Sequence, residues 1–366
     1  MLPLGGCLST DKPEPGLDIP LAYALGPKNP TLAAAALPTL DWWRGFRSKE
    51  LTEIIEEARA ANLDIAVAVA QIVQADAQSR VAGAPLLPLV TLDGSASRLR
   101  SSQATSLGPA TGLGGSERDL LSTSLTASYE IDFWGKNRSA LRAAEESAVA
   151  SRYNSEVVGL TVVVSVANTY FQVLAAQDRL RIARENVASA TRILNLIRQQ
   201  FSAGTASDLN VAQQESLVDT QRASIPPLVQ TLRQSEAALA LLIARPPERV
   251  VIRGGSMRGI AIPRITPGLP SELLAQRPDI RQAEANLAAA NANVQNARAQ
   301  MLPSITLTGI GGYQSAVLAT LLRPESAFYT ATAGLTQPIF DGARLQGNLD
   351  LQKGIQDQLL QNYLLQ

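Results

Sequence analysis

The segment from 136 to 201 constrains the fold of this 366-residue chain more than any other. It contains no proline and a single glycine, and its apolar residues recur at the spacing of an α-helix. A helix of about 65 residues is about 97 Å long, which no ordinary globular domain needs. Gly204 interrupts the pattern, and Asp208 begins a return segment that runs to Ala244 with a break at 226–227. The sequence therefore predicts a long α-helical hairpin.

An internal repeat predicts the organisation of the rest. Residues 64–94 align with 279–309 without a gap. In each copy an alanine-rich helix with Asp in its first turn runs to a Leu-Pro pair, and a strand follows. The informative identities are Asp64/Asp279, Ile65/Ile280, Leu87/Leu302, Pro88/Pro303, Thr91/Thr306, Leu92/Leu307 and Gly94/Gly309.

Four segments alternate between apolar and polar residues and are predicted strands, at about 88–100, 119–133, 303–313 and 328–338. One apolar and one hydroxyl-rich face over roughly ten residues is typical of transmembrane barrel strands around a wet lumen; a soluble sandwich is the alternative. Four strands cannot close a barrel, for which about eight is the smallest common number, so several chains would pool their strands. The stretches 101–118 and 314–327 are predicted loops at the outer end. In the second strand the apolar face holds Leu121, Leu125, Ala127, Tyr129, Ile131 and Phe133, with Thr123 among them, and in the first Val90, Leu92 and Ala96 oppose Thr91, Asp93, Ser95 and Ser97.

Composition excludes several classes of function. Lys plus Arg equals Asp plus Glu at 32 each, so no net field attracts nucleic acid, and we predict no nucleic-acid partner. There is no histidine, and Cys7 is the only cysteine, which excludes metal clusters and nucleophilic triads. We predict no cofactor and no enzyme, although a carboxylate pair remains formally open. The adjacent pairs at 56–57 and 145–146 do not face each other on a helix and are predicted solvated. No run of about 18 apolar residues predicts a transmembrane helix.

The N-terminus resembles the end of a bacterial lipoprotein signal, in which small residues precede a lipidated cysteine. Leu4-Gly5-Gly6-Cys7 fits this pattern and predicts an acyl anchor, such as palmitate, at Cys7; a chance cysteine is the alternative. Only six residues precede Cys7, so the start is expected to be trimmed or wrongly assigned. Leu8 follows the cysteine, and the resemblance then implies sorting to the outer membrane. The proline-rich stretch 8–40 is predicted to be an extended strap.

Several motifs together resemble the TolC-like outer-membrane factor family, especially its OprM/NodT-like efflux lipoprotein branch. The resemblance implies a homotrimer with a twelve-stranded outer-membrane β-barrel continuous with a periplasmic α-helical barrel. It also implies a periplasmic adaptor (membrane fusion protein) and an inner-membrane pump as partners, besides outer-membrane lipid. The motifs are Leu273-Leu274-Ala275-Gln276-Arg277-Pro278-Asp279-Ile280, then Ala283-Glu284, Leu287, Ala290 and Leu302-Pro303-Ser304, with Gln337 to Gly342, Glu130 to Gly135, Asp41-Trp42-Trp43 and Ala240-Leu241-Leu242 before Pro246.

The motif residues also have plain structural roles. Pro278 fits the first position of a helix, Asp279 complements the helix dipole, and Arg277 is expected to pair locally. Trp42 and Trp43 precede the first helix, which favours packing at an equatorial level over a membrane-interface belt.

The segment after the long helix is the candidate functional site. It resembles the periplasmic tip that closes the tunnel at rest and meets the adaptor. Family tips often carry Asp where Asn210 stands, which leaves Asp208 as the candidate charged gate residue, with a helix cap as the alternative. The predicted adaptor-contact residues are Gly204, Thr205, Ala206, Ser207, Asp208 and Asn210.

The predicted fold class is an α+β membrane protein with four transmembrane β-strands per chain, long α-helical hairpins and an internal structural repeat. The expected segments are 1–47, an anchor and extended stretch; 48–245, the first repeat with its hairpin 136–244; 246–276, an equatorial linker; and 277–366, the second repeat, with helices 278–300 and 342–366. The first repeat continues for about 110 residues beyond Gly135, whereas 366 − 342 = 24 residues follow Gly342. The second hairpin is therefore expected to be incomplete, and this chain alone is expected not to conduct.

The predicted function is the exit duct of a tripartite efflux pump, which passes drugs or metal ions passively through the bacterial outer membrane and extends into the periplasm. Two alternatives stay open. One is the outer-membrane component of a protein secretion system, in the same fold. The other is a periplasmic adaptor or coiled-coil scaffold, which explains a hairpin but not amphipathic strands in both repeats.

Overall fold

The computed structural model describes residues 41–100, 117–263, 274 and 276–366. The chain divides into two compact units. The strand unit contains Val73–Ser151 and Ile280–Gln366, and the hairpin unit contains Arg152–Asp279 and the described part of Asp18–Ile72. The strand unit thus combines segments that the sequence assigns to both repeats.

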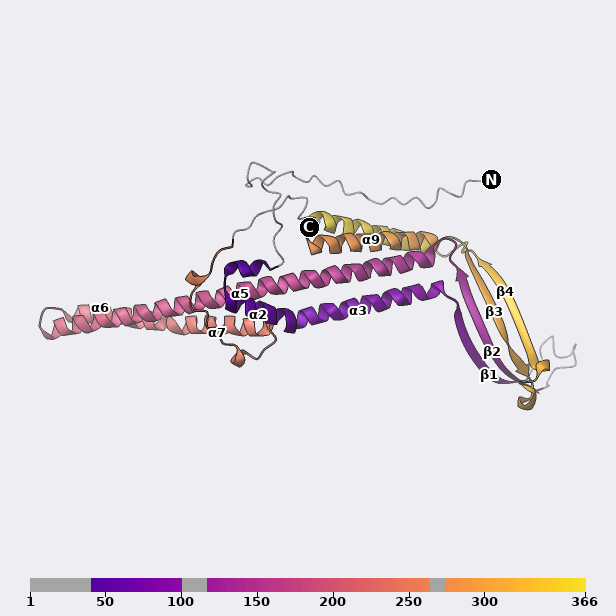
Figure 1. The fold of residues 1–366 in the computed structure, drawn as a ribbon, viewed down its shortest axis with the longest axis horizontal. Coiled ribbons are helices and arrows are strands. Elements are labelled where there is room, and N and C mark those ends of the chain that lie inside the picture. Colours follow the sequence, from indigo (N-terminus) through magenta and orange to yellow (C-terminus); the bar gives the residue numbers. More distant parts are fainter. Residues whose placement is uncertain (1–40, 101–116, 264–273, 275) are drawn as a thin grey trace, which may run out of the picture. The chain divides into compact units, whose positions relative to one another are not determined.

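A four-stranded antiparallel sheet in the order β1-β2-β3-β4 dominates the strand unit (Figure 1). The strands are β1 (Leu89–Arg100), β2 (Glu117–Ile131), β3 (Ser304–Ser315) and β4 (Ala327–Thr336), so all four predicted strands are confirmed. β2 ends two residues before the predicted Phe133, because Asp132 turns to cap the next helix. Most of the loop predicted at 101–118 lies outside the described residues. The stretch predicted as a loop at 314–327 contains two short 3-10 turns, η6 (Leu318–Thr320) and η7 (Pro324–Ser326).

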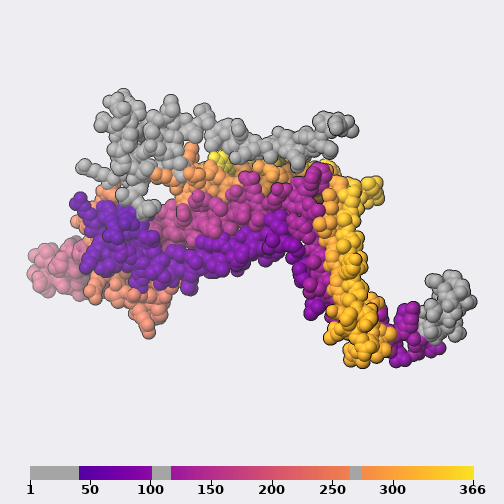
Figure 2. All heavy atoms as spheres, turned by 45° about the vertical axis from the view of Figure 1, so that its right-hand side comes forward, coloured from indigo at the N-terminus to yellow at the C-terminus, as the bar shows by residue number. Residues whose placement is uncertain are grey.

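The register of the sheet separates its side chains into two faces. Leu92 pairs with Leu125 and Asp93 with Ser124. Apolar residues therefore lie opposite apolar residues, and polar residues opposite polar residues, on neighbouring strands. In Figure 2 no helix covers the visible face of the β3–β4 part of the sheet, orange to yellow. The apolar face holds Val90, Leu92, Ala96, Leu121, Leu125, Ala127, Tyr129, Ile131, Ile305, Leu307, Ala331, Ala333 and Leu335, and the polar face Thr91, Asp93, Ser95, Ser97, Ser122, Ser124, Thr126, Ser128, Glu130, Thr306, Thr308, Thr330, Thr332 and Thr336.

The helices of the strand unit adjoin the ends of the strands. Helix α3 (Leu63–Gly83) leads through the turn η3 (Ala84–Leu86) into β1, and α9 (Pro278–Ala299) leads into β3. Helix α10 (Arg344–Leu365) lies beside α9 (Figure 1), where Leu349 packs on Val294 and Ala297. The buried residues of α9 are mainly alanines, which allows close helix packing.

Helix α5 (Lys136–Ser202) has 67 residues and a length of about 100 Å, as the sequence predicts. An 18-residue window within it has a mean hydropathy of 1.7, enough by length and composition to cross a membrane, and 39% of that window is buried. A core helix can pass the same test, so the expectation of no transmembrane helix stays a prediction. Val162, Val166 and Val173 of α5 pack in the core of the hairpin unit.

The hairpin unit pairs the far part of α5 with α6 (Asp208–Ala223) and α7 (Ile225–Leu242) (Figure 1). The break between α6 and α7 lies at Ser224, just before the predicted 226–227, because the two prolines occupy the first turn of α7. Helix α2 (Lys49–Ala61) and the turns η2 (Trp42–Phe46), η4 (Pro247–Arg249) and η5 (Met257–Gly259) complete the unit.

The core of the hairpin unit contains both N-terminal tryptophans. Trp43 is 3% exposed, and Trp42 packs edge-on against it with ring centroids 6.0 Å apart. Leu51, Ile55 and Tyr170, each at most 1% exposed, lie in the same cluster. The prediction that the tryptophans serve packing is confirmed.

Candidate functional site

The end of the α5–α6 hairpin is a tight exposed turn centred on Gly204. Its φ of +75° lies in the left-handed region that side chains disfavour, although an added Cβ meets no atom within 4 Å. Glycine is therefore favoured at this position because of the backbone angle, and not because a side chain would clash with a neighbour. The backbone N–H groups of Gly204 and Thr205 donate to the carbonyl oxygens of Phe201 and Gln200, both at 2.9 Å, which closes α5 with a Schellman motif.

Ser207 starts the return helix as its N-cap. The backbone N–H of Asn210 donates to Ser207 Oγ at 3.3 Å, and the Ser207 hydroxyl donates to Asn210 Oδ1. The Asn210 side chain thus orients the capping hydroxyl, which is a local structural role. The alternative that Asp208 is a helix cap is wrong, because Ser207 occupies the N-cap position of α6. Asp208 lies exposed in the first turn of α6, where a carboxylate complements the helix dipole.

The hairpin is held together close behind this turn. Arg198 Nη2 lies 2.6 Å from Glu215 Oε1, and Gln214 Nε2 donates to the carbonyl oxygen of Ala190 at 3.1 Å. Leu194 and Val218 pack between the two helices, with Val218 only 1% exposed. The hairpin end is thus presented on a rigid support.

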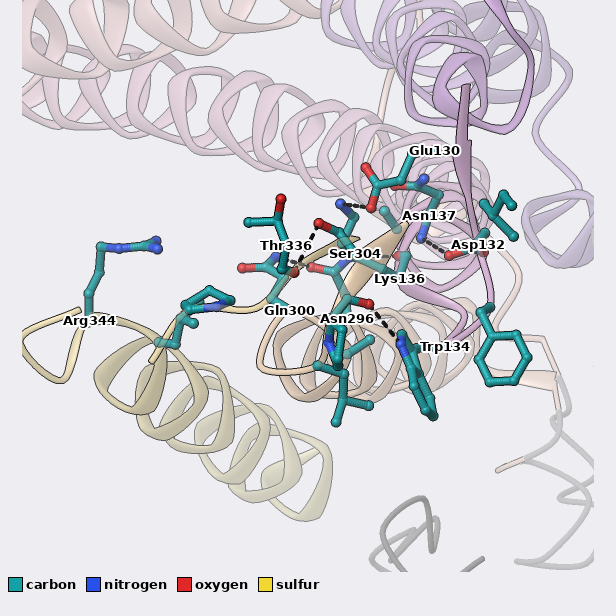
Figure 3. Close-up of a pocket in the computed structure, with 18 residues that line it drawn as sticks. Glu130, Asp132, Trp134, Lys136, Asn137, Asn296, Gln300, Ser304, Thr336 and Arg344 are labelled. Atoms are coloured by element: carbon teal, nitrogen blue, oxygen red, sulfur yellow. Dashed lines mark hydrogen bonds and ion pairs between the residues drawn. The ribbon is translucent and has the colours of Figure 1, made fainter. Parts of the chain in front are cut away.

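The second candidate site is a cavity of about 530 Å³ in the strand unit, where the strands meet the helices (Figure 3). Lys136 Nζ lies 2.5 Å from Glu130 Oε1, and the Trp134 indole N–H donates to the carbonyl oxygen of Pro303 at 2.8 Å. Asn296 Nδ2 donates to the carbonyl oxygen of Lys136 at 2.7 Å. The last two hydrogen bonds join the β2–α5 junction to the α9–β3 junction, so these residues have a structural role.

Asp132 caps α5 at the same cavity by accepting hydrogen bonds from the backbone N–H groups of Asn137 and Arg138, both at 2.9 Å. Burial raises the pKa of the Asp132 carboxyl, but these two bonds and the Arg138 guanidinium outweigh burial and hold the pKa below its ordinary value of 3.8. The charged carboxylate is therefore the form that stabilises the junction.

The comparisons with known proteins agree with this geometry. A sequence profile described as outer membrane efflux protein matches residues 54–245 and 269–364. The chain belongs to the outer membrane efflux protein family. The pyoverdine export outer membrane protein OpmQ of Pseudomonas putida is 41% identical over 99% of this chain and 76% of its own length. The cation efflux system protein CusC of Escherichia coli K12 is 30% identical over 99% of this chain and 78% of its own.

Solved structures of efflux channels have the same fold as this efflux protein. A CusC structure superposes with a TM-score of 0.83 at 27% identity, covering 97% of this chain and 78% of that one. The Campylobacter jejuni CmeC outer membrane channel gives 0.83 at 26% identity, covering 96% and 75%. The predicted fold class, the outer-membrane location and the function as an efflux channel are confirmed, and the four strands are those of an outer-membrane barrel.

Other predicted residues of this efflux protein stand as follows. Pro278 opens α9, and Arg277 Nη2 lies 2.5 Å from Asp279 Oδ2, so the expected local pairing is confirmed. Cys7 lies outside the described residues. The adaptor-contact role of the hairpin end stays a prediction. Of the carboxylates predicted to be solvated at 56–57, Glu56 is exposed and forms an ion pair with Arg44 at 2.7 Å, and Glu57 is half-buried and pairs with Arg245.

Sequence reasoning missed the residues that fasten the 250–260 loop of the hairpin unit. Glu50 accepts from the backbone N–H groups of Arg253 and Gly254 and from the Tyr170 hydroxyl, at 2.8, 2.9 and 3.0 Å. Asp178 accepts from the Ser256 hydroxyl at 2.9 Å. These partners are more than 70 residues apart in the sequence, so no local sequence pattern predicts them.

Proposed function

We propose that three copies of this chain form the passive exit duct of a tripartite efflux pump. The observation that supports this is the sheet: among the described residues, β1 and β4 each have a strand neighbour on one side only. Open edges need partners, and three sheets of four strands make a twelve-stranded barrel. The apolar face then contacts lipid and the hydroxyl-rich face lines a wet lumen.

The hairpin end is the proposed contact with a periplasmic adaptor, which in turn joins an inner-membrane pump. Its residues Gly204, Thr205, Ala206, Ser207, Asp208 and Asn210 offer small side chains and backbone at an exposed turn. Phe201 and Leu209 flank the turn and are 46% and 66% exposed, which adds apolar surface for a partner. Asp208, repeated by threefold symmetry, would add a ring of charge, whereas Asn210 contributes none.

The proposed cargo is a small molecule rather than a protein. The relatives are named for export of pyoverdine, cations and toluene. The proposed anchor is an acyl chain on Cys7; a relative, SilC of Salmonella typhimurium, is named a probable outer membrane lipoprotein. The proposed duct is passive, so the inner-membrane pump would supply the energy for transport.

The adaptor contact is tested by Gly204→Val, with Gly255→Val as the matched control. Both glycines have positive φ, +75° and +78°, and open space around Cα, but Gly255 lies in the loop fastened by Glu50. We expect Gly204→Val to keep heat-resistant trimers in the outer membrane while co-purification of the adaptor falls. Gly255→Val should leave both the trimers and the adaptor contact intact. Unchanged co-purification of the adaptor with Gly204→Val would refute the contact, and absence of heat-resistant trimers of the unsubstituted chain would refute the duct.

A further inference from the structure

One carboxylate interrupts the hydroxyl-rich face of the sheet in the middle of a strand. Across the described strands, the charged residues on this face are Asp93, Arg118 and Glu130. Arg118 lies at the beginning of β2, and Glu130 is paired with Lys136 at the junction. Asp93 is the one that lies in the middle of a strand.

Hydroxyl groups surround Asp93. Its Oδ2 accepts hydrogen bonds from Thr91 Oγ1 at 3.1 Å and Thr126 Oγ1 at 3.4 Å, and its cross-strand neighbour is Ser124. Within the part of the chain that the structure describes, Asp93 forms no ion pair. Its charge is oriented by hydroxyls, and no side chain among the described residues neutralises it, so its field extends into the space above the sheet.

The repeat supplies an internal comparison. Aligned through Pro88/Pro303 and Gly94/Gly309, Asp93 of β1 corresponds to Thr308 of β3. Thr308 lies on the same polar face, opposite Ser128 and Thr332. A threonine therefore suffices for the fold at this position, and the carboxylate in the first repeat needs another explanation.

We infer that Asp93 makes the barrel interior favour cationic over anionic solutes. The inference rests on the proposed trimer with its polar face inward. There, three Asp93 carboxylates lie at one level of the lumen, where they attract positive and repel negative groups on a passing solute. Asp93 thus acts on selectivity by charge rather than as a binding site.

Charged thiol reagents test this in outer membranes that carry the full chain. Ser95→Cys places a thiol on the polar face about 7 Å from Asp93, and Leu92→Cys places one on the apolar face. The unsubstituted chain, whose only thiol is Cys7, gives the background. The readout is the ratio of the rates at which trimethylammonium-ethyl and sulfonatoethyl methanethiosulfonate label the Ser95→Cys variant. Because both reagents react with the same thiolate, any effect of Asp93 on the reactivity of that thiolate cancels in the ratio of the two rates.

Adding Asp93→Asn to the Ser95→Cys variant should lower that ratio about twofold at physiological salt and about fivefold at about 0.01 M, where screening is weaker. Asp93→Thr, which introduces the residue type of the second repeat, should do the same. The control Asp119→Asn removes a charge from the apolar face of β2 and should leave the ratio unchanged.

The outcomes separate the two proposals. If the thiol of the Ser95→Cys variant is no more accessible to these reagents than that of Leu92→Cys, the polar face is not a wet lumen and the proposed duct fails. If the Ser95→Cys variant is labelled but its ratio is unchanged by both Asp93→Asn and Asp93→Thr, the inference fails and the duct stands. A ratio that falls equally in the Asp119→Asn control also overturns the inference.

Discussion

Glu50 fastens the 250–260 loop to helices α2 and α5, and its removal should loosen that loop by a predictable amount. The Glu50 carboxylate accepts three hydrogen bonds, from the backbone N–H groups of Arg253 and Gly254 and from the Tyr170 hydroxyl. Hydrogen bonds to a charged group contribute about 1.5–3 kcal/mol each. Arg253 and Gly254 are exposed, so water can replace the lost acceptor at both N–H groups.

We therefore expect Glu50→Ala to lower the free energy of local opening by about 2–3 kcal/mol, well below the simple sum. The assay is hydrogen exchange at the amides of Arg253 and Gly254, which should accelerate about 30- to 150-fold. Tyr170→Phe removes one of the three bonds and should cost about 1 kcal/mol, or about fivefold. Burial and the nearby Glu50 carboxylate raise the pKa of Tyr170, so its hydroxyl remains a donor.

Glu53→Ala is the matched control on the same helix. Glu53 forms an exposed ion pair with Lys49 at 3.6 Å, whose loss should cost less than about 1 kcal/mol and leave the loop amides unchanged. The reasoning is wrong if exchange at Arg253 and Gly254 is the same in Glu50→Ala as in the unsubstituted chain, or rises as much in Glu53→Ala.

Three further predictions concern the hairpin end and the junction. Ser207→Ala removes the cap of α6 and should cost about 1 kcal/mol, seen as faster exchange at the Asn210 amide. Trp134→Phe removes the bond to Pro303 and should destabilise the junction by about 1–3 kcal/mol, measured by unfolding of the strand unit in denaturant. The folded-state pKa of Asp132 is depressed, so its contribution is present above its unfolded pKa and is lost as the pH falls through the folded value. Protection of the first turn of α5 against hydrogen exchange should therefore decrease when the pH is lowered below about 4. In the Asp132→Asn variant this protection should not change with pH in that range.

Local periodicity was enough to predict the elements of this protein. The alternation of Leu92 and Asp93 along one strand depends only on the pleat, and the register then carries it across the sheet. The α5 helix could be predicted almost to its last residue because nothing in 136–201 breaks it and Gly204 ends it. The end of β2 could not, because Asp132 can continue a strand or cap a helix, and only its neighbours decide.

The same distinction between local and long-range contacts applies to the candidate site. The turn at Gly204 is local and was predicted from the sequence, whereas the cap of α6 falls on Ser207 rather than on Asp208, the residue that the sequence offered. The indole bond from Trp134 spans 169 residues and the Tyr170–Glu50 bond 120, and such pairs depend on how helices and strands pack rather than on spacing along the chain.

The sequence by itself determined the class of protein: a duplicated unit of amphipathic strands and a long helical hairpin, since each of these depends on contacts within a few residues. Only the tertiary structure decided what the individual polar residues do. In the structure Asn210 accepts a hydrogen bond from the capping hydroxyl of Ser207, Glu50 holds a distant loop, and Asp93 lies among hydroxyl groups. Each of these roles is set by the atoms that folding brings within hydrogen-bond distance.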